Sequence, residues 1–228
     1  MCISAETSFA SAAVIGAIGA YILKKKPIQQ HKLLALTPLL FALQQFIEGF
    51  VWLSLTNESD FGCVQSIASG FYLSFALVIW PLFVPLAIYL WEQTKSRKQM
   101  LMPLIIMGAF VSVWEIYWVY IANGYSVNIH DPSGHLQYIR DVPYQNIVKY
   151  MYVAAALLPF FVCSENRVKI LGSVFAGSFV LSYIFYRPTY ESTWCLAAAI
   201  ISIGIYAVVD FKKKDEDKDK DEQLKVNN

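Results

Sequence analysis

Long apolar stretches alternate with short polar segments along most of the chain. Seven stretches have about the length that a helix needs to cross a bilayer core, roughly 17–25 residues. They are Ser8–Leu23, Leu33–Leu55, Ile67–Trp91, Met100–Ala122, Ile147–Cys163, Ile170–Tyr186 and Thr193–Val209. The pattern predicts an all-α, polytopic bundle of seven transmembrane helices. The first, fifth and sixth stretches are short, so six spans with one re-entrant segment is the alternative.

Basic residues fall mainly on one side of the predicted membrane. Fifteen of the 18 Lys and Arg residues follow the first, third, fifth and seventh stretches, and the others are Arg140, Lys149 and Arg187. Because cytoplasmic segments carry an excess of Lys and Arg, we predict an outer N-terminus and an inner C-terminus. Residues 1–211 form the predicted membrane domain. Residues 212–228 mix Lys with Asp and Glu and predict a disordered, charged cytoplasmic tail.

Composition agrees with a membrane protein and excludes other classes. Hydrophobic residues make up 57% of the chain and charged residues 15%, whereas soluble domains are about 25% charged. A cytosolic globular enzyme is therefore excluded. A net charge of +1 offers no field to a polyanion, which argues against a nucleic-acid partner. The expected partners are the lipid bilayer and a small-molecule or ion ligand, and a homo-oligomer is left open.

Proline and small residues predict local geometry within the spans. Trp80-Pro81 and Pro85 lie in the middle of the third stretch and should kink that helix, since proline removes a backbone donor. Small residues recur at every fourth position of the first stretch, a pattern typical of closely packed membrane helices. These residues are Ser8, Ala12, Gly16 and Ala20.

Glu48 and Glu115 are the strongest functional signals, because they lie inside apolar stretches. A charge at the centre of a bilayer costs at least about 2.5 kcal/mol on insertion scales, so such residues face the bundle interior. Each glutamate precedes the outer end of its stretch by seven residues. Equal depth predicts one shared, outward-facing pocket. The alternative is that each glutamate is protonated and only hydrogen-bonds a neighbouring helix.

Further polar and aromatic residues share helix faces with these glutamates. Gln44 and Trp52 lie one turn before and after Glu48, and Ser112 lies three residues before Glu115. Trp52 and Trp114 flank the glutamates and could form an aromatic wall that attracts a cation. Their alternative interpretation is the aromatic belt at the membrane interface.

Cysteine and histidine residues gather near the predicted outer boundary. Two of Cys2, Cys63 and Cys195 could form a disulfide there. Together with His130 and His135 they could instead hold a metal, but the spacing matches no ligand motif, so a metal is not favoured. The segment 123–146 that carries both histidines is predicted to be either a lid or disordered.

Residues that are missing from the spans exclude some known chemistries. The seventh stretch has no lysine, so a retinal Schiff base is excluded. The stretches contain no histidine, which argues against seven-helix zinc hydrolases. We therefore expect that the protein is not an enzyme, although a metal-dependent membrane-embedded enzyme is one of the open hypotheses.

About the first 55 residues of the chain carry a family resemblance. Met1-Cys2-Ile3-Ser4-Ala5 and Gln44-Gln45-x-x-Glu48-Gly49-x-x-Trp52 resemble a family of small bacterial multi-pass membrane proteins of unknown function that begin M-C-F-S-A. The resemblance implies a bacterial inner (plasma) membrane location and implies no activity. The predicted topology is also similar to that of seven-helix sugar transporters built from two repeats, but their Pro-Gln signature is missing.

The leading hypothesis is a transporter or channel-like protein for a small solute or ion, with Glu48 and Glu115 in an outward-facing pocket. In it, one glutamate holds a proton and couples proton movement to the substrate. The alternatives are a membrane sensor or ligand-binding protein and the metal-dependent enzyme.

Overall fold

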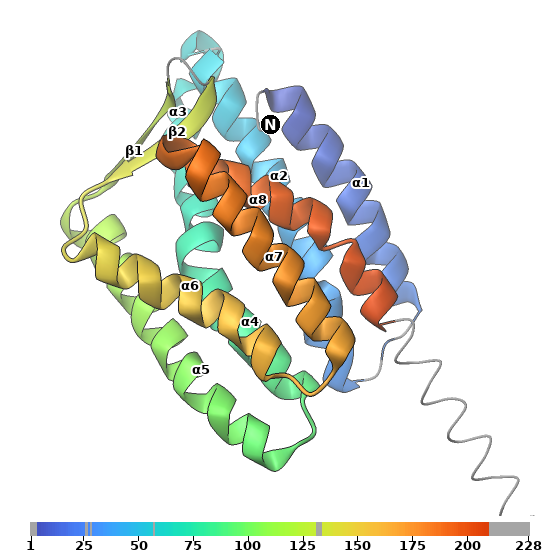
Figure 1. The fold of residues 1–228 in the computed structure, drawn as a ribbon. Helices are drawn as coiled ribbons and strands as arrows, with labels where there is room; N and C mark the ends of the chain where they lie inside the picture. The colour runs from blue at the N-terminus through green and yellow to red at the C-terminus, as the bar shows by residue number, and fades with distance from the viewer. Residues whose placement is uncertain (1–3, 26, 28, 57, 131–133, 210–228) are drawn as a thin grey trace, which may run out of the picture.

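The structure is a computed structural model that describes residues 4–25, 27, 29–56, 58–130 and 134–209 (Figure 1). Within residues 58–63, only the backbone is described. Cys2, the Cys63 side chain and the predicted tail 212–228 therefore lie outside the described part of the chain.

Within the described residues, seven helices are long and apolar enough to cross a membrane. They comprise Ala5–Lys24, Gln29–Thr56, Val64–Trp91, Lys95–Ala122, Gln145–Val162, Asn166–Phe185 and Arg187–Val209. The predicted all-α bundle of seven spans is confirmed. The apolar stretches were the right guide because each span must satisfy its backbone hydrogen bonds internally, which a helix does.

Several spans consist of more than one helical element. The elements are α1 (Ala5–Lys24), η1 (Gln29–His31), α2 (Lys32–Thr56), α3 (Glu58–Leu73), η2 (Ser74–Ile79), α4 (Trp80–Trp91), α5 (Lys95–Glu115), η3 (Ile116–Ala122), α6 (Gln145–Val162), α7 (Asn166–Phe185), η4 (Arg187–Thr189) and α8 (Tyr190–Ile201). Successive spans run in opposite directions (Figure 1). We call the end with the β-hairpin the hairpin end, and the opposite end, which carries Lys24, Lys95 and Lys169, the basic end.

The segment predicted to be a lid or disordered contains a β-hairpin. Strands β1 (Tyr125–His130) and β2 (His135–Arg140) are antiparallel, and Tyr125 pairs with Arg140. Because side chains alternate along a strand, Leu136, Tyr138 and Arg140 share one face of β2. Leu136 and Tyr138 are buried against the bundle, where the Tyr138 ring stacks on Tyr72 with centroids 4.6 Å apart. The hairpin therefore covers the bundle and turns Arg140 toward it.

Two spans contain π-helical stretches. The stretch η2 ends where Trp80-Pro81 begins α4, which is the position of the predicted kink. Pro81 cannot donate a backbone hydrogen bond, so a wider turn before it relieves the clash with the preceding carbonyl groups. The stretch η3 follows Glu115 directly. Such wide turns are frequent at functional sites.

Small residues allow close helix contacts, although not all of those expected. Ser8 and Ala12 of α1 are buried as predicted, but Ala20 is exposed and Gly19 packs against Leu39 instead. The face of α1 thus follows the helical period more closely than a strict four-residue spacing. The tightest approach is at Gly108 of α5, where an added Cβ would lie 1.9 Å from the carbonyl oxygen of Pro81.

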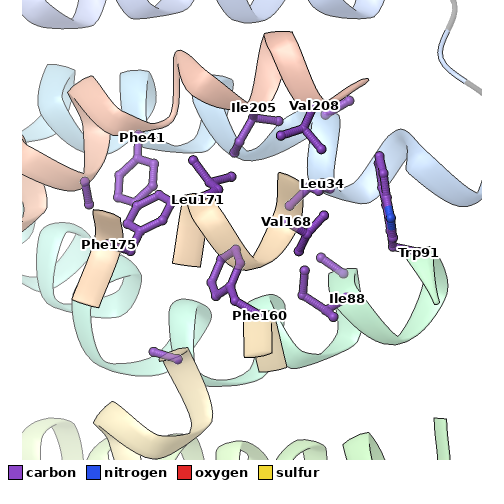
Figure 2. Packing of buried hydrophobic residues seen from close by; sticks show 14 of the residues in the cluster. Leu34, Phe41, Ile88, Trp91, Phe160, Val168, Leu171, Phe175, Ile205 and Val208 are labelled. Carbon is purple, nitrogen blue, oxygen red and sulfur yellow. The ribbon is translucent and has the colours of Figure 1, made fainter. Parts of the chain in front are cut away.

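Apolar side chains fill the bundle from the basic end to its middle. Figure 2 shows Phe41, Phe160, Phe175, Leu171 and Ile205 converging from different helices. A second cluster, which includes Val51, Tyr72, Val119 and Leu136, lies beneath the hairpin. In lipid, such interdigitation and interhelical hydrogen bonds hold helices together, because lipid tails are as apolar as the side chains.

Candidate functional site

Arg140 of the hairpin joins two membrane-spanning helices through ion pairs. Its Nη1 lies 3.2 Å from Oε1 of Glu115, at the end of α5, and its Nη2 lies 2.5 Å from Oε1 of Glu191, in the first turn of α8. The Arg140 and Glu115 side chains are each 5% exposed, and that of Glu191 is 15% exposed. We call these three residues the ion triad.

Burial makes the ion triad mutually dependent. Removing charges from water is costly, and a buried charge that loses its partner is strongly destabilising. Burial disfavours the charged guanidinium, but attraction by Glu191 and Glu115 outweighs that effect and raises the pKa of Arg140 above its ordinary value. The hydroxyl of Tyr190 donates a further hydrogen bond to Glu191 Oε1 at 3.2 Å. The hairpin is thus held to the bundle by charge as well as by packing.

A small cavity lies beside the ion triad. Its wall includes all three triad residues together with Lys149 of α6, and we call it the polar cavity. The volume in which the centre of a water-sized molecule can lie is about 30 Å³. Gln145, exposed in the first turn of α6, also lines it, so the polar cavity reaches toward the hairpin end.

A second cavity, which we call the apolar cavity, lies deeper among the helices. It is lined mainly by aromatic and aliphatic side chains, including Phe41, Trp80, Phe160 and Phe175. Its volume by the same measure is about 40 Å³. Tyr152, Trp194 and Cys195 line both cavities. The two cavities are therefore neighbours that share these three side chains.

Glu48 is fully buried but lies in a different hydrogen-bond network. Its Oε1 accepts a hydrogen bond from the Ser192 hydroxyl at 2.6 Å, and its Oε2 accepts one from Gln45 Nε2 at 2.9 Å. Glu115 lines the polar cavity, whereas Glu48 lines neither cavity. The expectation of one pocket holding both glutamates is thus not met. The two carboxylates are linked through consecutive residues of α8, since Ser192 follows Glu191.

Gln44 connects the apolar cavity wall to a buried thiol. Its Oε1 accepts a hydrogen bond from Trp80 Nε1 at 2.7 Å, and its Nε2 lies 3.1 Å from Cys195 Sγ. Cys195 is a free, buried cysteine. The predicted disulfide through Cys195 is therefore wrong in this structure, because α8 turns this side chain into the bundle rather than toward the outer boundary.

The other predicted residues have packing roles. The Ser112 hydroxyl donates to the carbonyl oxygens of Val78 and Gly108, at 2.7 and 2.9 Å, which ties α5 to η2. Trp52 is buried beneath the hairpin, and Trp114 packs against Trp118 and Phe110. Neither Trp52 nor Trp114 lines the polar or the apolar cavity. Trp194 is the tryptophan beside the ion triad.

The two histidines are cross-strand neighbours in the hairpin. His130 Nδ1 lies 3.1 Å from Gln137 Oε1, and the His135 ring meets Tyr186 edge to face. Among the described residues, no group of three His, Cys, Asp or Glu side chains could hold a metal ion. The metal site drawn from Cys195, His130 and His135 does not form within this part of the chain.

Sequence reasoning missed Arg140, Glu191, Tyr152 and Lys149 as site residues. Arg140 and Lys149 had been read only as charges on the outer side, and Glu191 lay just before the predicted start of the last span at Thr193. The alternation of Leu136, Tyr138 and Arg140 was the available signal, because it predicts a strand that places Arg140 on its apolar face.

Comparison with known proteins finds a family for the chain. The profile of a family of unknown function, DUF6629, matches residues 1–220. The chain belongs to this family. No curated protein and no solved structure shows significant similarity to it. The resemblance to an uncharacterised family is thereby confirmed, while the opening motif and a bacterial origin stay predictions.

Proposed function

We propose that the chain transports a small solute and that the polar cavity is its outward-facing binding site. The observation that carries the proposal is the ion triad, which fastens a hairpin outside the spans to Glu115 and Glu191 at the edge of a cavity. Solvent-excluded ionisable residues in membrane proteins characteristically mark substrate and proton pathways. A solute that reaches the triad can exchange the internal ion pairs for contacts with itself.

The hairpin acts in this proposal as the outer gate. Leu136 and Tyr138 pack the apolar face of the hairpin against the bundle, and Arg140 forms its ion pairs. When Arg140 withdraws, the polar cavity opens and both carboxylates lose a partner, which favours protonation of one of them. The apolar cluster toward the basic end closes the other side of the path. Orientation with the hairpin end outside follows the distribution of basic residues.

Glu48 would hold the coupling proton within this scheme. It is fully buried, and its Ser192 contact lies next to Glu191 of the triad. A change at the triad that moves the first turn of α8 therefore changes the hydrogen bonding of Glu48. Proton coupling of this kind predicts uptake that depends on pH.

Uptake into proteoliposomes tests the transport proposal. A panel of radiolabelled amines, amino acids and short alcohols is offered to the purified full chain. We expect the wild type to take up one class of these solutes and Glu115→Gln to lose this uptake. The variant keeps the Arg140–Glu191 pair and should therefore still fold. Arg187→Gln is the matched control, because it removes a charge from the exposed surface of the same end. Tight binding without flux would overturn transport and favour a sensor.

The gate has a test that needs no solute. Cys195 lines both cavities, whereas Cys163 is buried in the loop after α6 and lines neither. Arg140→Lys cannot form the two-armed pairing of the guanidinium, so the variant should increase modification of Cys195 by a small cationic methanethiosulfonate. Peptide mass spectrometry would follow both cysteines. Equal modification of Cys195 in the wild type and the variant would contradict a gate at Arg140.

A further inference from the structure

The polar and apolar cavities meet at Tyr152, Trp194 and Cys195. We propose that they form one binding site for a small, uncharged amphiphile, with a hydrogen-bond-accepting head in the polar cavity and a short alkyl tail in the apolar cavity. This inference rests on the proposed transport function and names its substrate class.

The charges of the polar cavity favour an uncharged head. Its wall carries the carboxylates of Glu115 and Glu191 and the cations of Arg140 and Lys149, so the formal charges of these residues balance. An ionic head group would leave one charge without compensation in a poorly hydrated space, which is costly. A neutral head avoids that cost.

Two hydrogen-bond donors without partners indicate which chemical group the head of the ligand carries. Arg140 Nε and Trp194 Nε1 are buried and have no hydrogen-bond partner among the described residues, and both residues line the polar cavity. Both atoms can only donate. A hydroxyl or carbonyl oxygen accepts hydrogen bonds, so a head of this type that reaches either atom removes the penalty of that buried, unpaired donor. The head is therefore an alcohol or carbonyl type of group.

The apolar cavity supplies room for the tail. Figure 2 shows Phe41, Phe160 and Phe175 grouped with Leu34 and Ile205, and all five line this cavity. Cavities lined in this way stay dry and bind small apolar molecules. Because Trp194 and Cys195 line both spaces, a ligand that spans the junction touches them with its middle.

The cavity sizes set the length of the ligand. The volumes are about 40 and 30 Å³, and a water-sized group needs roughly 10–15 Å³ by this measure. The site thus accommodates about five to seven non-hydrogen atoms. 1-Pentanol has a hydroxyl head and this size, whereas 1-decanol exceeds it.

Protection of Cys195 tests the inference directly. The purified full chain in detergent is treated with N-ethylmaleimide in the presence of 1-pentanol, and peptide mass spectrometry follows Cys195 and Cys163 separately. We expect 1-pentanol to slow the reaction of Cys195, by about threefold at twice its dissociation constant, and not that of Cys163. Pentylammonium, pentanoate and 1-decanol should protect less, because the first two carry charge and the third is too long.

Variants assign the two halves of the site. Trp194→Phe removes one head donor and should weaken protection by 1-pentanol. Ala156→Leu fills the apolar cavity and should abolish protection by 1-pentanol. Ala198→Val adds a smaller side chain to the wall of the same cavity and serves as a second variant in case the first does not fold. Ala10→Leu, on the exposed face of α1, is the control for added apolar volume and should leave protection unchanged.

The outcomes separate this inference from the proposed function. Equal protection of Cys195 and Cys163, equal protection by all probes, or protection that survives filling of the cavity would overturn the amphiphile site. Uptake of a charged solute without protection by 1-pentanol would overturn this inference and leave transport standing. Protection of Cys195 by 1-pentanol without uptake of any solute would overturn transport and leave the amphiphile site standing.

Discussion

Glu191 and Ser192 are consecutive in α8, yet each holds a different buried group: Glu191 pairs with Arg140 of the hairpin, and Ser192 donates to Glu48 of α2. The first turn of α8 is therefore the mechanical link between the ion triad and Glu48. A displacement that breaks one contact strains the other.

The Ser192–Glu48 contact should be measurable as a coupling energy. Ser192→Ala leaves a buried carboxyl oxygen with one donor fewer and should destabilise the protein by about 1–3 kcal/mol. In the double variant Ser192→Ala/Glu48→Gln, the loss in free energy of unfolding should be smaller than the sum of the two single losses, by about 0.5–3 kcal/mol. Thermal unfolding in detergent gives the values. Ser178→Ala, which removes only a local bond to Phe175, is the control, and strict additivity would contradict the contact.

Gly108 should not tolerate a side chain. Its added Cβ would lie 1.9 Å from the Pro81 carbonyl oxygen, so backbone would have to move. We expect Gly108→Ala to cost about 1–3 kcal/mol and lower the unfolding temperature. Gly177→Ala is the matched control, since an added Cβ there meets nothing within 4 Å, and it should be neutral or slightly stabilising. Similar behaviour of both variants would refute this close contact of α4 and α5.

Glu92, just after α4, should make stability depend on pH. Burial acts to raise its pKa, but the N–H groups of Thr94 and Ser164 and the Ser164 hydroxyl outweigh burial and lower the pKa from 4.5 to about 2. The ionised form thus stabilises the folded state fully above about pH 4.5. That stability is lost as the pH falls toward 2, with a slope of at most about 1.4 kcal/mol per pH unit.

The Glu92 effect can be isolated by comparison with a non-titrating variant. Glu92→Gln should unfold at a lower temperature than the wild type at pH 6, and the difference should shrink between pH 4.5 and 2. Asp141→Asn removes an exposed carboxylate and should show no such convergence. A difference that stays constant down to pH 2 would speak against the hydrogen-bonded carboxylate.

Membrane orientation has a matched pair of reporters. Tyr144 and Gln99 are exposed, at the hairpin end and the basic end respectively. We expect Tyr144→Cys to react with a membrane-impermeant maleimide on intact cells and Gln99→Cys to react only after lysis, with the wild type as background. The opposite labelling pattern would reverse the topology.

The spans were predictable because bilayer thickness imposes a length and composition that local sequence reveals. Glu115 was found for the same reason, since a charge in an apolar stretch is conspicuous. Its partners were not, because Arg140 and Glu191 lie 25 and 76 residues further along the chain, in polar surroundings where charge is ordinary. Their meeting depends on how the hairpin folds back over the bundle, and that is a long-range property.

Depth along a helix also proved insufficient to predict a shared pocket. Glu48 and Glu115 were placed at equal depth, but which cavity a side chain faces depends on the rotation of its helix. Spacing along the chain gives the depth of a residue but not the direction in which its helix face points once the helices are packed. The same limit applies to Cys195, which was assigned to the outer boundary and instead lies inside.

The ion triad also fixes an order of assembly. The ribosome releases Glu115 first, then Arg140, and Glu191 only with the last span, so a nascent chain can form only one of the two pairs. The second ion pair of the hairpin, between Arg140 and Glu191, can form only after α8 has been inserted beside its neighbours. A chain that stops before α8 keeps the Arg140–Glu115 pair but lacks the contact with Glu191, so one ion pair instead of two should hold its hairpin to the bundle.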